Sequence, residues 1–219
     1  MRIGVKFSRL GFSKYISHLD MQRLFGRAIM RAGIPAKYSE GFNPHMNLSF
    51  ASPLAVGLES VGDYFEFYAD ECVLVRDAQE RLNQALPDGF QIVNMGILTE
   101  GSGKLMAVTM QAGYEVCFED AAFLTWLLEV MGGSKYMLSR VRKGKAQVLD
   151  IRPLIHQCEV DGNKAVLRLE NSGRASLSPL HLLREASDVT GKQQFARVVR
   201  QELYTVKDDT VLPLDALWR

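Results

Sequence analysis

The order of hydrophobic patterns in the first hundred residues restricts the possible fold most strongly. Residues 2–9 alternate apolar Ile3, Val5 and Phe7 with more polar side chains, which is typical of a half-buried strand. Further strand patterns follow, and two segments with helical periodicity lie between them. The resulting order is strand, helix, strand, strand, helix, strand over residues 2–9, 17–33, 47–51, 62–69, 73–86 and 90–98. This order predicts a ferredoxin-like α+β domain with an antiparallel sheet.

The second part of the chain repeats this order with an addition. Helical patterns over residues 121–131 and 178–186 lie between strand patterns. Two β-hairpins are predicted between these helices, one from strands 136–141 and 146–151 and another from strands 155–160 and 164–170, so the second half contains an extra hairpin. The glycine-containing segment TEGSGK, residues 99–104, is the expected boundary. We therefore predict two ferredoxin-like halves, residues 1–103 and residues 104–219.

The first predicted helix carries an unusual row of cations. Ser17 is a suitable N-cap, and Gly33 followed by Pro35 predicts the end of the helix. Apolar residues recur on one face of this helix, from Met21 to Ala32. Arg23, Arg27 and Arg31 recur every four residues on a different face, and Asp20 is the one carboxylate of the helix that can pair with them.

Two interpretations of this arginine row remain open. Residues 1–50 contain eight Lys or Arg and two Asp or Glu, whereas residues 51–100 contain two and nine. The acidic segment could therefore fold against the arginines and neutralise them. Alternatively, the guanidinium groups bind phosphate, whose oxygens they match in geometry. The net charge of the whole chain is only +1, which excludes a generic polyanion binder.

The segment that follows the helix has a composition suited to contacts with a base. Tyr38, Phe42, Asn43 and His45 lie close together in a loop marked by Gly41 and Pro44. Aromatic rings stack on unpaired bases, and amide and imidazole groups can hydrogen-bond to base edges. The alternative is that the aromatic rings fix the loop to the core and His45 caps a backbone group.

A second basic feature is the turn between the predicted strands 136–141 and 146–151, which contains Arg142, Lys143 and Lys145. A basic hairpin tip can contact a nucleic-acid backbone, but it can also be an ordinary solvated turn. The candidate RNA-binding residues are therefore Lys14, Arg23, Arg27, Arg31, Tyr38, Phe42, Asn43, His45, Arg142, Lys143 and Lys145.

Catalytic chemistry has weaker support in the sequence. His18, Asp20 and His45 could supply acid–base groups for RNA processing or modification. No nucleophile motif or phosphate-binding loop accompanies them. Cys72, Cys117 and Cys158 are too far apart for a zinc or iron–sulfur motif, and we expect neither a metal site nor a cofactor.

Composition and the lengths of the apolar runs limit the cellular location that we expect. The chain has 219 residues, of which 47% are hydrophobic and 23% charged, as in a globular protein. No apolar run approaches the roughly 20 residues that a membrane helix needs, and the first residues lack the apolar core of a signal peptide. We expect a cytoplasmic protein with no membrane partner.

Two segments resemble a known family. They are KYISHLDMQRLFGRAIMRAGIPAKYSEGFNPHMNLSFASPLAVGLES, residues 14–60, and RKGKAQVLDIRP, residues 142–153. Both are similar to the radical SAM-linked protein family, a domain of unknown function found fused behind a radical SAM enzyme or as a separate chain. The resemblance implies a separate radical SAM protein as the partner. The C-x₃-C-x₂-C motif that would hold a radical SAM cluster is absent from this chain.

The leading hypothesis is a non-catalytic module that binds tRNA or rRNA beside a radical SAM enzyme. In the first alternative, the arginine row docks on an acidic surface of that protein and RNA is incidental. In the second alternative, the chain is itself an enzyme acting on RNA. The sequence leaves open whether it performs any chemistry, and it does not indicate the oligomeric state.

Overall fold

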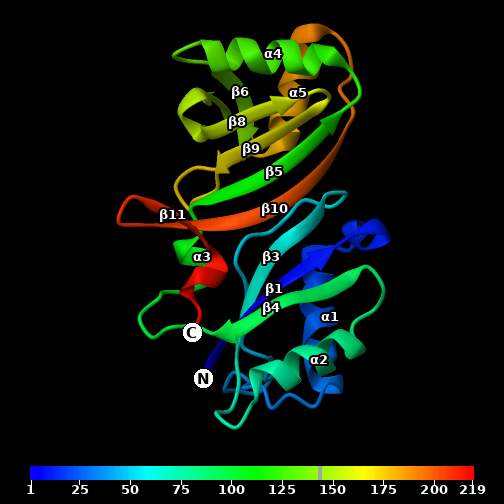
Figure 1. The fold of residues 1–219 in the computed structure, drawn as a ribbon, viewed down its shortest axis with the longest axis vertical. Coiled ribbons are helices and arrows are strands. Elements are labelled where there is room, and N and C mark those ends of the chain that lie inside the picture. The colour runs from blue at the N-terminus through cyan, green and yellow to red at the C-terminus, as the bar shows by residue number, and fades with distance from the viewer. Residues whose placement is uncertain (143–144) are drawn as a thin grey trace. The chain divides into compact units, whose positions relative to one another are not determined.

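The structure is a computed structural model of the 219-residue chain. It describes the backbone of residues 1–142 and 145–219, and the side chains of residues 1–139 and 148–219. The described residues form a mixed α+β protein with a mostly antiparallel sheet and five α-helices (Figure 1). The chain divides into two compact units, Met1–Thr109 with Arg200–Arg219, and Met110–Val199.

The first unit contains an antiparallel sheet in the order β4–β1–β3, and both β2 and the end of β10 lie along β3. Central residues define the register, because Val5 of β1 lies opposite Phe65 of β3 and Met95 of β4. The elements of this unit are β1 (Arg2–Arg9), α1 (His18–Arg31), β2 (Leu48–Phe50), β3 (Glu59–Tyr68), α2 (Val75–Ala85), β4 (Phe90–Ile97), α3 (Leu105–Val108), the end of β10 (Ala196–Lys207) and β11 (Thr210–Pro213).

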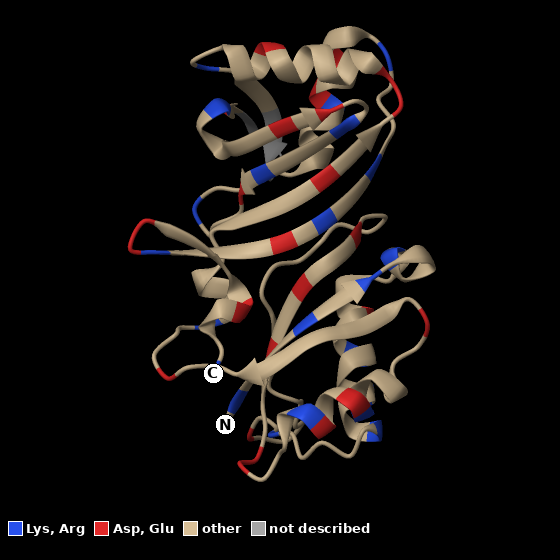
Figure 2. Cartoon of the chain, in the orientation of Figure 1, with Lys and Arg blue, Asp and Glu red and all other residues tan. Residues whose placement is uncertain are grey.

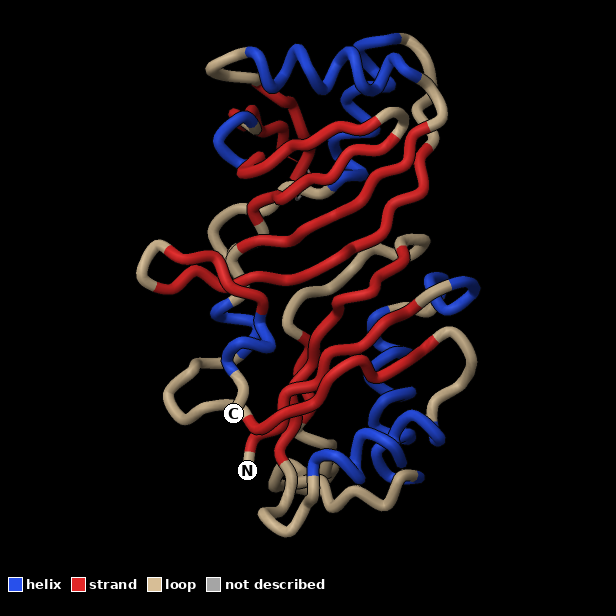
Figure 3. The backbone as a smooth tube through the Cα atoms, in the orientation of Figure 1, coloured by secondary structure: helices blue, strands red, loops and turns tan. Residues whose placement is uncertain are grey.

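Helices α1 and α2 cover one face of this sheet (Figure 3). Phenylalanine rings fill the space between the layers, and the ring centroid of Phe25 on α1 lies 4.7 Å from those of both Phe7 and Phe65. Helix α2 contributes the buried residues Ala78 and Leu82. The alternation of strand side chains and the helical spacing of apolar residues thus form one core, as both patterns predict.

The opposite face of this sheet carries small and polar residues. The indole of Trp218 lies across β1 and β4 where glycines leave room, and a Cβ atom at Gly4 would collide with its ring. Beside it, the carboxylate of Glu202 accepts hydrogen bonds from Lys6 (2.5 Å) and from the hydroxyl of Tyr64 (2.6 Å). Burial raises the pKa of Tyr64, and the adjacent carboxylate raises it further.

The second unit contains an antiparallel sheet in the order β5–β9–β8 and a separate two-stranded hairpin, β6–β7. Helices α4 and α5 contact each other and bury residues such as Trp126 and Leu182. The elements are β5 (Gln111–Phe118), α4 (Ala121–Gly132), β6 (Met137–Arg142), β7 (Lys145–Asp150), β8 (Ile155–Asp161), β9 (Lys164–Glu170), α5 (Pro179–Thr190) and the start of β10.

The unit boundary differs from the one expected at residues 103–104. The first unit continues to Thr109, and the segment Arg200–Arg219 belongs to it as well. This return of the chain rests on specific contacts, because the guanidinium of Arg200 pairs with Asp63 of β3. Periodicity within a strand cannot reveal such a pairing between residues far apart in the sequence.

The part of the chain that the structure describes contains neither a candidate membrane helix nor a candidate metal cluster. No helix there is long and apolar enough to cross a membrane. No group of three or more His, Cys, Asp or Glu side chains there could hold a metal ion.

Candidate functional site

Helix α1 presents its arginines on the side away from the core. Ser17 accepts a hydrogen bond from the backbone N–H of Asp20 (3.2 Å), so the expected N-cap is confirmed. Met21, Phe25, Ala28 and Ile29 are buried against the sheet. Arg23, Arg27 and Arg31 are all exposed, and we call them the arginine stripe. Figure 2 marks the Lys and Arg positions along the backbone in blue.

The arginines of this stripe have few partners within the protein. Arg23 pairs with Asp20 at 3.1 Å, and Arg31 donates to the backbone carbonyl of Ala85 at 2.7 Å. Among the described residues, Arg27 has no hydrogen-bond acceptor and no carboxylate within 4 Å. Within the described residues, no carboxylate of the acidic segment 51–100 forms an ion pair with the arginine stripe. In the part of the chain that the structure describes, the acidic segment therefore does not neutralise the arginine stripe, although Glu66 pairs with Arg2 elsewhere in the unit.

The carboxylate of Asp20 is held by its own helix end. The hydroxyl of Ser17 donates to Asp20 at 2.7 Å, and this hydrogen bond, followed by the contact with Arg23, keeps the pKa of Asp20 below its usual value. Both side chains of the Asp20–Arg23 pair are more than half exposed, at 59% and 68%. Solvent screens such a pair strongly, so Asp20 does not bind Arg23 tightly.

The segment after α1 forms a hairpin-like loop beside the helix. Tyr38 and Met46 form an isolated β-bridge, and the N–H of Ser39 donates to the carbonyl of His45 at 2.8 Å. The hydroxyl oxygen of Ser39 accepts from the N–H of His45 (3.1 Å) and lies 2.9 Å from its Nδ1. These contacts fix the imidazole of His45 at the base of the loop.

A surface groove of about 580 Å³ lies between α1 and this loop, and we call it the Gly26 groove. Its polar side chains include Arg23 and Arg27 on the helix and His45 on the loop. The complete lining is Gln22, Arg23, Gly26, Arg27, Met30, Tyr38, His45, Met46 and Leu48. The groove thus combines two cations, an aromatic ring, an imidazole and an apolar surface that contains two methionines.

Gly26 has no explanation within the fold. It lies in the interior of α1, where glycine is less favourable than alanine by about 1 kcal/mol. A Cβ atom at this position would meet no other atom within 4 Å. No packing contact therefore requires glycine there. A ligand that approaches the helix backbone closely would require it.

A second hollow of about 510 Å³ lies on the other flank of the arginine stripe, and we call it the Leu24 hollow. It shares Arg23 and Arg27 with the Gly26 groove. Its lining is Asp20, Arg23, Leu24, Arg27, Arg31, Ala85, Leu86 and Pro87. The arginine stripe therefore forms a ridge with one open hollow on each side.

Several predicted RNA-binding residues lie outside both hollows. Phe42 and Asn43 are exposed at the tip of the loop and do not line the groove. The ammonium group of Lys14 lies 5.4 Å from the ring centroid of Tyr15, a cation–π contact away from the groove lining. Arg142 and Lys145 belong to the backbone of β6 and β7 in the second unit, whereas their side chains and Lys143 lie outside the described residues.

The three acid–base candidates are in different places. His45 lines the Gly26 groove, whereas Asp20 lines the Leu24 hollow. The ring of His18 packs edge-on against Phe50 at 5.2 Å between centroids, and it lines neither hollow. The arrangement of these residues does not form a nucleophile–base pair.

Sequence reasoning missed Gln22, Gly26 and Met30, which line the floor and edges of the groove. A signal for them was present, because these residues recur every four positions directly beside the arginine stripe. A glycine in the middle of a helix that is otherwise rich in good helix formers was the strongest sign.

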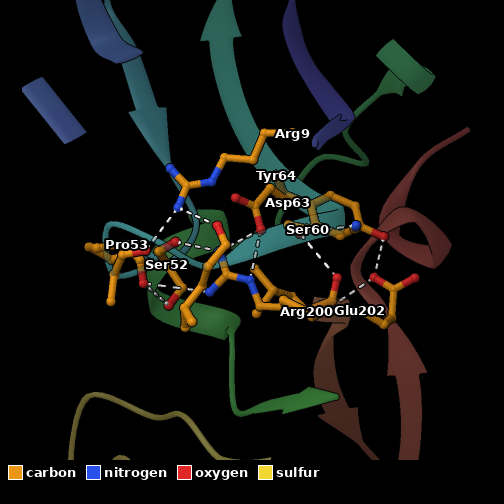
Figure 4. A network of polar contacts seen from close by, with 12 residues as sticks. Arg9, Ser52, Pro53, Ser60, Asp63, Tyr64, Arg200 and Glu202 are labelled. Carbon is orange, nitrogen blue, oxygen red and sulfur yellow. Dashed lines mark hydrogen bonds and ion pairs between the residues drawn. The ribbon is translucent and has the colours of Figure 1, made fainter. Parts of the chain in front are cut away.

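Two further arginines are buried in the first unit (Figure 4). The Nε of Arg200 donates to Asp63 at 2.7 Å, and its Nη2 donates to the carbonyl of Ser52 at 3.0 Å. Arg9 donates to the carbonyls of Ala55 and Leu58, at 3.0 and 3.1 Å. Burial lowers the pKa of Arg9, and the charge of Asp63 partly opposes this effect. These guanidiniums fix the segment between β2 and β3.

Comparison with known proteins places the chain in a family. The sequence pattern of the family described as "Uncharacterized protein conserved in bacteria (DUF2344)" matches residues 2–205. The chain belongs to this family. No curated protein matches this DUF2344 chain. A solved structure, "Crystal Structure of an Unknown Protein from Galdieria sulphuraria", is similar at 11% identity over 91% of this chain and 97% of that chain. Its TM-score of 0.28 supports no conclusion about function.

Proposed function

We propose that this DUF2344 chain is a non-catalytic module that binds single-stranded RNA, with tRNA or rRNA as the natural ligand. One observation carries the proposal: Arg27 is exposed and has no partner among the described residues, and it borders a groove lined by Tyr38 and His45. An unpartnered guanidinium on a surface attracts a phosphate, and the adjacent groove can hold the base next to that phosphate.

The arginine stripe supplies the contacts with the RNA backbone. Each guanidinium offers several N–H donors in a planar fork that matches two phosphate oxygens. Arg31 uses one nitrogen to reach Ala85, so its remaining donors are available for phosphate. Phosphate contacts of this type provide affinity and position without reading the base sequence.

The Gly26 groove supplies the contacts with one unpaired base. Gly26 has no side chain to keep a flat ring away from the helix backbone, and Tyr38 offers a stacking surface. Because the oxygen of Ser39 accepts from the N–H of His45, its own hydroxyl hydrogen can be donated to Nδ1. In the neutral imidazole the proton then lies on Nε2, which can donate to a base edge or a phosphate.

We also propose that both units are ferredoxin-like. The support in the first unit is the strand order β4–β1–β3–β2 with both helices in the crossover connections. The support in the second unit is the order β5, α4, β8, β9, α5, β10 along the chain, with the hairpin β6–β7 inserted. Such units leave one sheet face without helices, and in the first unit Trp218 covers part of that face. Fold-level analogy alone does not indicate a function.

The proposed partner is a separate radical SAM protein in the cytoplasm. Its support is the resemblance of residues 14–60 and 142–153 to the radical SAM-linked family. The module would present RNA to that enzyme rather than act on it. Retention of a radical SAM protein by the tagged chain in nuclease-treated lysate would separate direct docking from contact through RNA.

The test of RNA binding compares matched variants of the full chain. Fluorescence anisotropy with a labelled single-stranded RNA of about 12 nucleotides measures the affinity at low salt. The triple variant Arg23→Ala/Arg27→Ala/Arg31→Ala should bind at least tenfold more weakly, whereas the triple Arg→Lys variant should lie between it and the wild type. No binding by the wild type, or equal binding by the alanine variant, would contradict the proposal.

A second candidate function is the binding of a protein partner, and the fully exposed ring of Phe42 at the loop tip supports it. A protruding aromatic side chain is a typical anchor for a protein partner. In this case Phe42→Ser would abolish capture of the partner and leave RNA binding unchanged. If the loop tip instead stacks on RNA, the same substitution would weaken RNA binding.

A further inference from the structure

The arginine stripe separates two hollows, and the RNA-binding proposal uses only one of them. Arg23 and Arg27 line both the Gly26 groove and the Leu24 hollow. Successive helix residues are rotated by about 100°, so Gln22 and Leu24 project to opposite sides of Arg23. A ligand bound on one side therefore meets the same guanidiniums as a ligand bound on the other.

We infer that two consecutive unpaired nucleotides straddle the arginine stripe. One base occupies the Gly26 groove, the next base covers the Leu24 hollow, and the phosphodiester that links them lies on Arg23 and Arg27. This inference rests on the proposed RNA binding and specifies the minimal ligand. A helix with its side chains is about 10 to 12 Å across, which neighbouring bases splayed to either side of one phosphate can span.

The two hollows offer different chemistry to the two bases. The Gly26 groove has polar groups at its edge, the amide of Gln22 and the imidazole of His45, so it can read the edge of a base. The Leu24 hollow offers apolar surface from Leu24, Leu86 and Pro87 beside its charged side chains, and the carbonyl of Ala85 is already bonded to Arg31. The first base is therefore selected by hydrogen bonds, and the second is bound by its ring face.

The charges around the ridge favour a phosphate at its centre. Asp20 lines the Leu24 hollow at the start of α1 and pairs with Arg23. Arg31 lies at the other end and donates to Ala85. Arg27 lies between them and has no partner among the described residues. The phosphodiester is thus expected at Arg27, away from the carboxylate of Asp20.

Competition by small ligands tests this geometry on the wild-type chain. Three competitors displace a labelled single-stranded RNA: AMP, the dinucleotide ApA, and ApA with an uncharged methylphosphonate linkage. AMP carries more negative charge than ApA, whose single charge lies on the linking phosphate. ApA should nevertheless compete about tenfold better than AMP, because a second base adds its own stacking contact. The methylphosphonate should compete at least about tenfold more weakly than ApA, because Arg27 loses its charged acceptor.

The possible outcomes separate this inference from the proposed function. If the labelled RNA binds but AMP competes as well as ApA, the straddling geometry is overturned and RNA binding stands. If the labelled RNA does not bind, or poly-glutamate displaces it as well as ApA does, both are overturned. Equal competition by ApA and its methylphosphonate also overturns the placement of the linking phosphate.

Substitutions in the Gly26 groove and in the Leu24 hollow test the two base positions separately. Gly26→Val should weaken both AMP and ApA, because it fills the groove that both occupy. Pro87→Glu places a carboxylate at the edge of the Leu24 hollow and should weaken ApA several-fold more than AMP, whereas Pro87→Gln should weaken ApA less. Pro87 is exposed, so both substitutions are expected to keep the fold. An equal effect of Pro87→Glu on AMP and ApA would contradict the second base position.

Discussion

Arg9 and Arg200 are buried in the first unit, whereas Arg23, Arg27 and Arg31 lie on the exposed face of α1. The side chain of Arg200 is 1% exposed and pairs with Asp63, and that of Arg23 is 68% exposed. The buried guanidiniums have carboxylate and carbonyl partners inside the protein. The surface guanidiniums have few partners, and Arg27 has none among the described residues. The same residue type therefore fixes the fold at one site and remains available for a ligand at the other.

The comparison predicts that the same substitution has a large effect on stability at one site and almost none at the other. Arg200→Met should lower the free energy of unfolding by about 3–5 kcal/mol, because it leaves the carboxylate of Asp63 buried without its partner. Arg27→Met removes an exposed side chain and should change that free energy by less than about 0.5 kcal/mol. Urea denaturation of both variants measures the difference.

A double variant checks the cause of the first effect. Arg200→Met combined with Asp63→Leu removes both charges of the pair and should recover part of the lost stability; recovery is incomplete because buried Arg9 also loses the favourable charge of Asp63. If the double variant is as unstable as Arg200→Met, the uncompensated charge of Asp63 is not the main cause of the loss.

The second prediction ranks the surface arginines by their effect on RNA binding. Arg27→Ala should weaken the binding of single-stranded RNA by about tenfold, the value of one lost charge-assisted contact. Arg31→Ala should have a smaller effect because Arg31 already donates to Ala85. Single-variant affinities at one salt concentration measure this order, and a larger loss for Arg31→Ala would show that the ligand does not centre on Arg27.

The third prediction concerns Gly26. Gly26→Ala should raise the free energy of unfolding by up to about 1 kcal/mol, because alanine favours the helix and its Cβ meets no other atom within 4 Å. The same substitution should weaken RNA binding, because the Cβ projects into the groove. A gain in both stability and affinity would show that the ligand does not approach the helix backbone there.

The smallest expected effect concerns the Asp20–Arg23 pair. Ser17→Ala should raise the pKa of Asp20 more than Arg23→Ala does, because the hydrogen bond from Ser17 is the larger cause of its lowered pKa. Since the folded-state pKa of Asp20 is lowered, its contribution to stability is present above the unfolded-state pKa. This contribution is lost as the pH falls through the folded-state pKa. NMR titration of Asp20 in both variants checks the order, and a larger shift in Arg23→Ala would mean that Asp20 binds this arginine firmly.

The sequence predicted the helix of the site correctly, but it predicted only some of the residues that line the groove. The helix cap at Ser17 and the exposed positions of Arg23, Arg27 and Arg31 follow from helical periodicity and from capping chemistry. The same periodicity shows which residues share the face of Arg27, but it does not show which loop lies beside that face. The predicted loop residues Tyr38 and His45 line the groove, whereas Phe42 and Asn43 lie at the tip.

Contacts between distant segments were not predictable from local patterns. Arg9 and Arg200 are far apart in the sequence, and both hold the segment between β2 and β3. The position of Arg200 in the first unit depends on the return of residues 200–219 to that unit. A lone arginine in a strand pattern normally predicts a solvated side chain, so the sequence indicated neither the buried pair nor the unit boundary.

The salt dependence of RNA binding tests the central claim, that the arginine stripe contacts phosphates. For the wild type, the logarithm of the association constant should fall linearly with the logarithm of the salt concentration. In the variant with Arg23, Arg27 and Arg31 replaced by alanine, the slope should be shallower by about 2, since each contact with a single strand contributes about 0.7. Equal slopes for the two proteins would contradict the account.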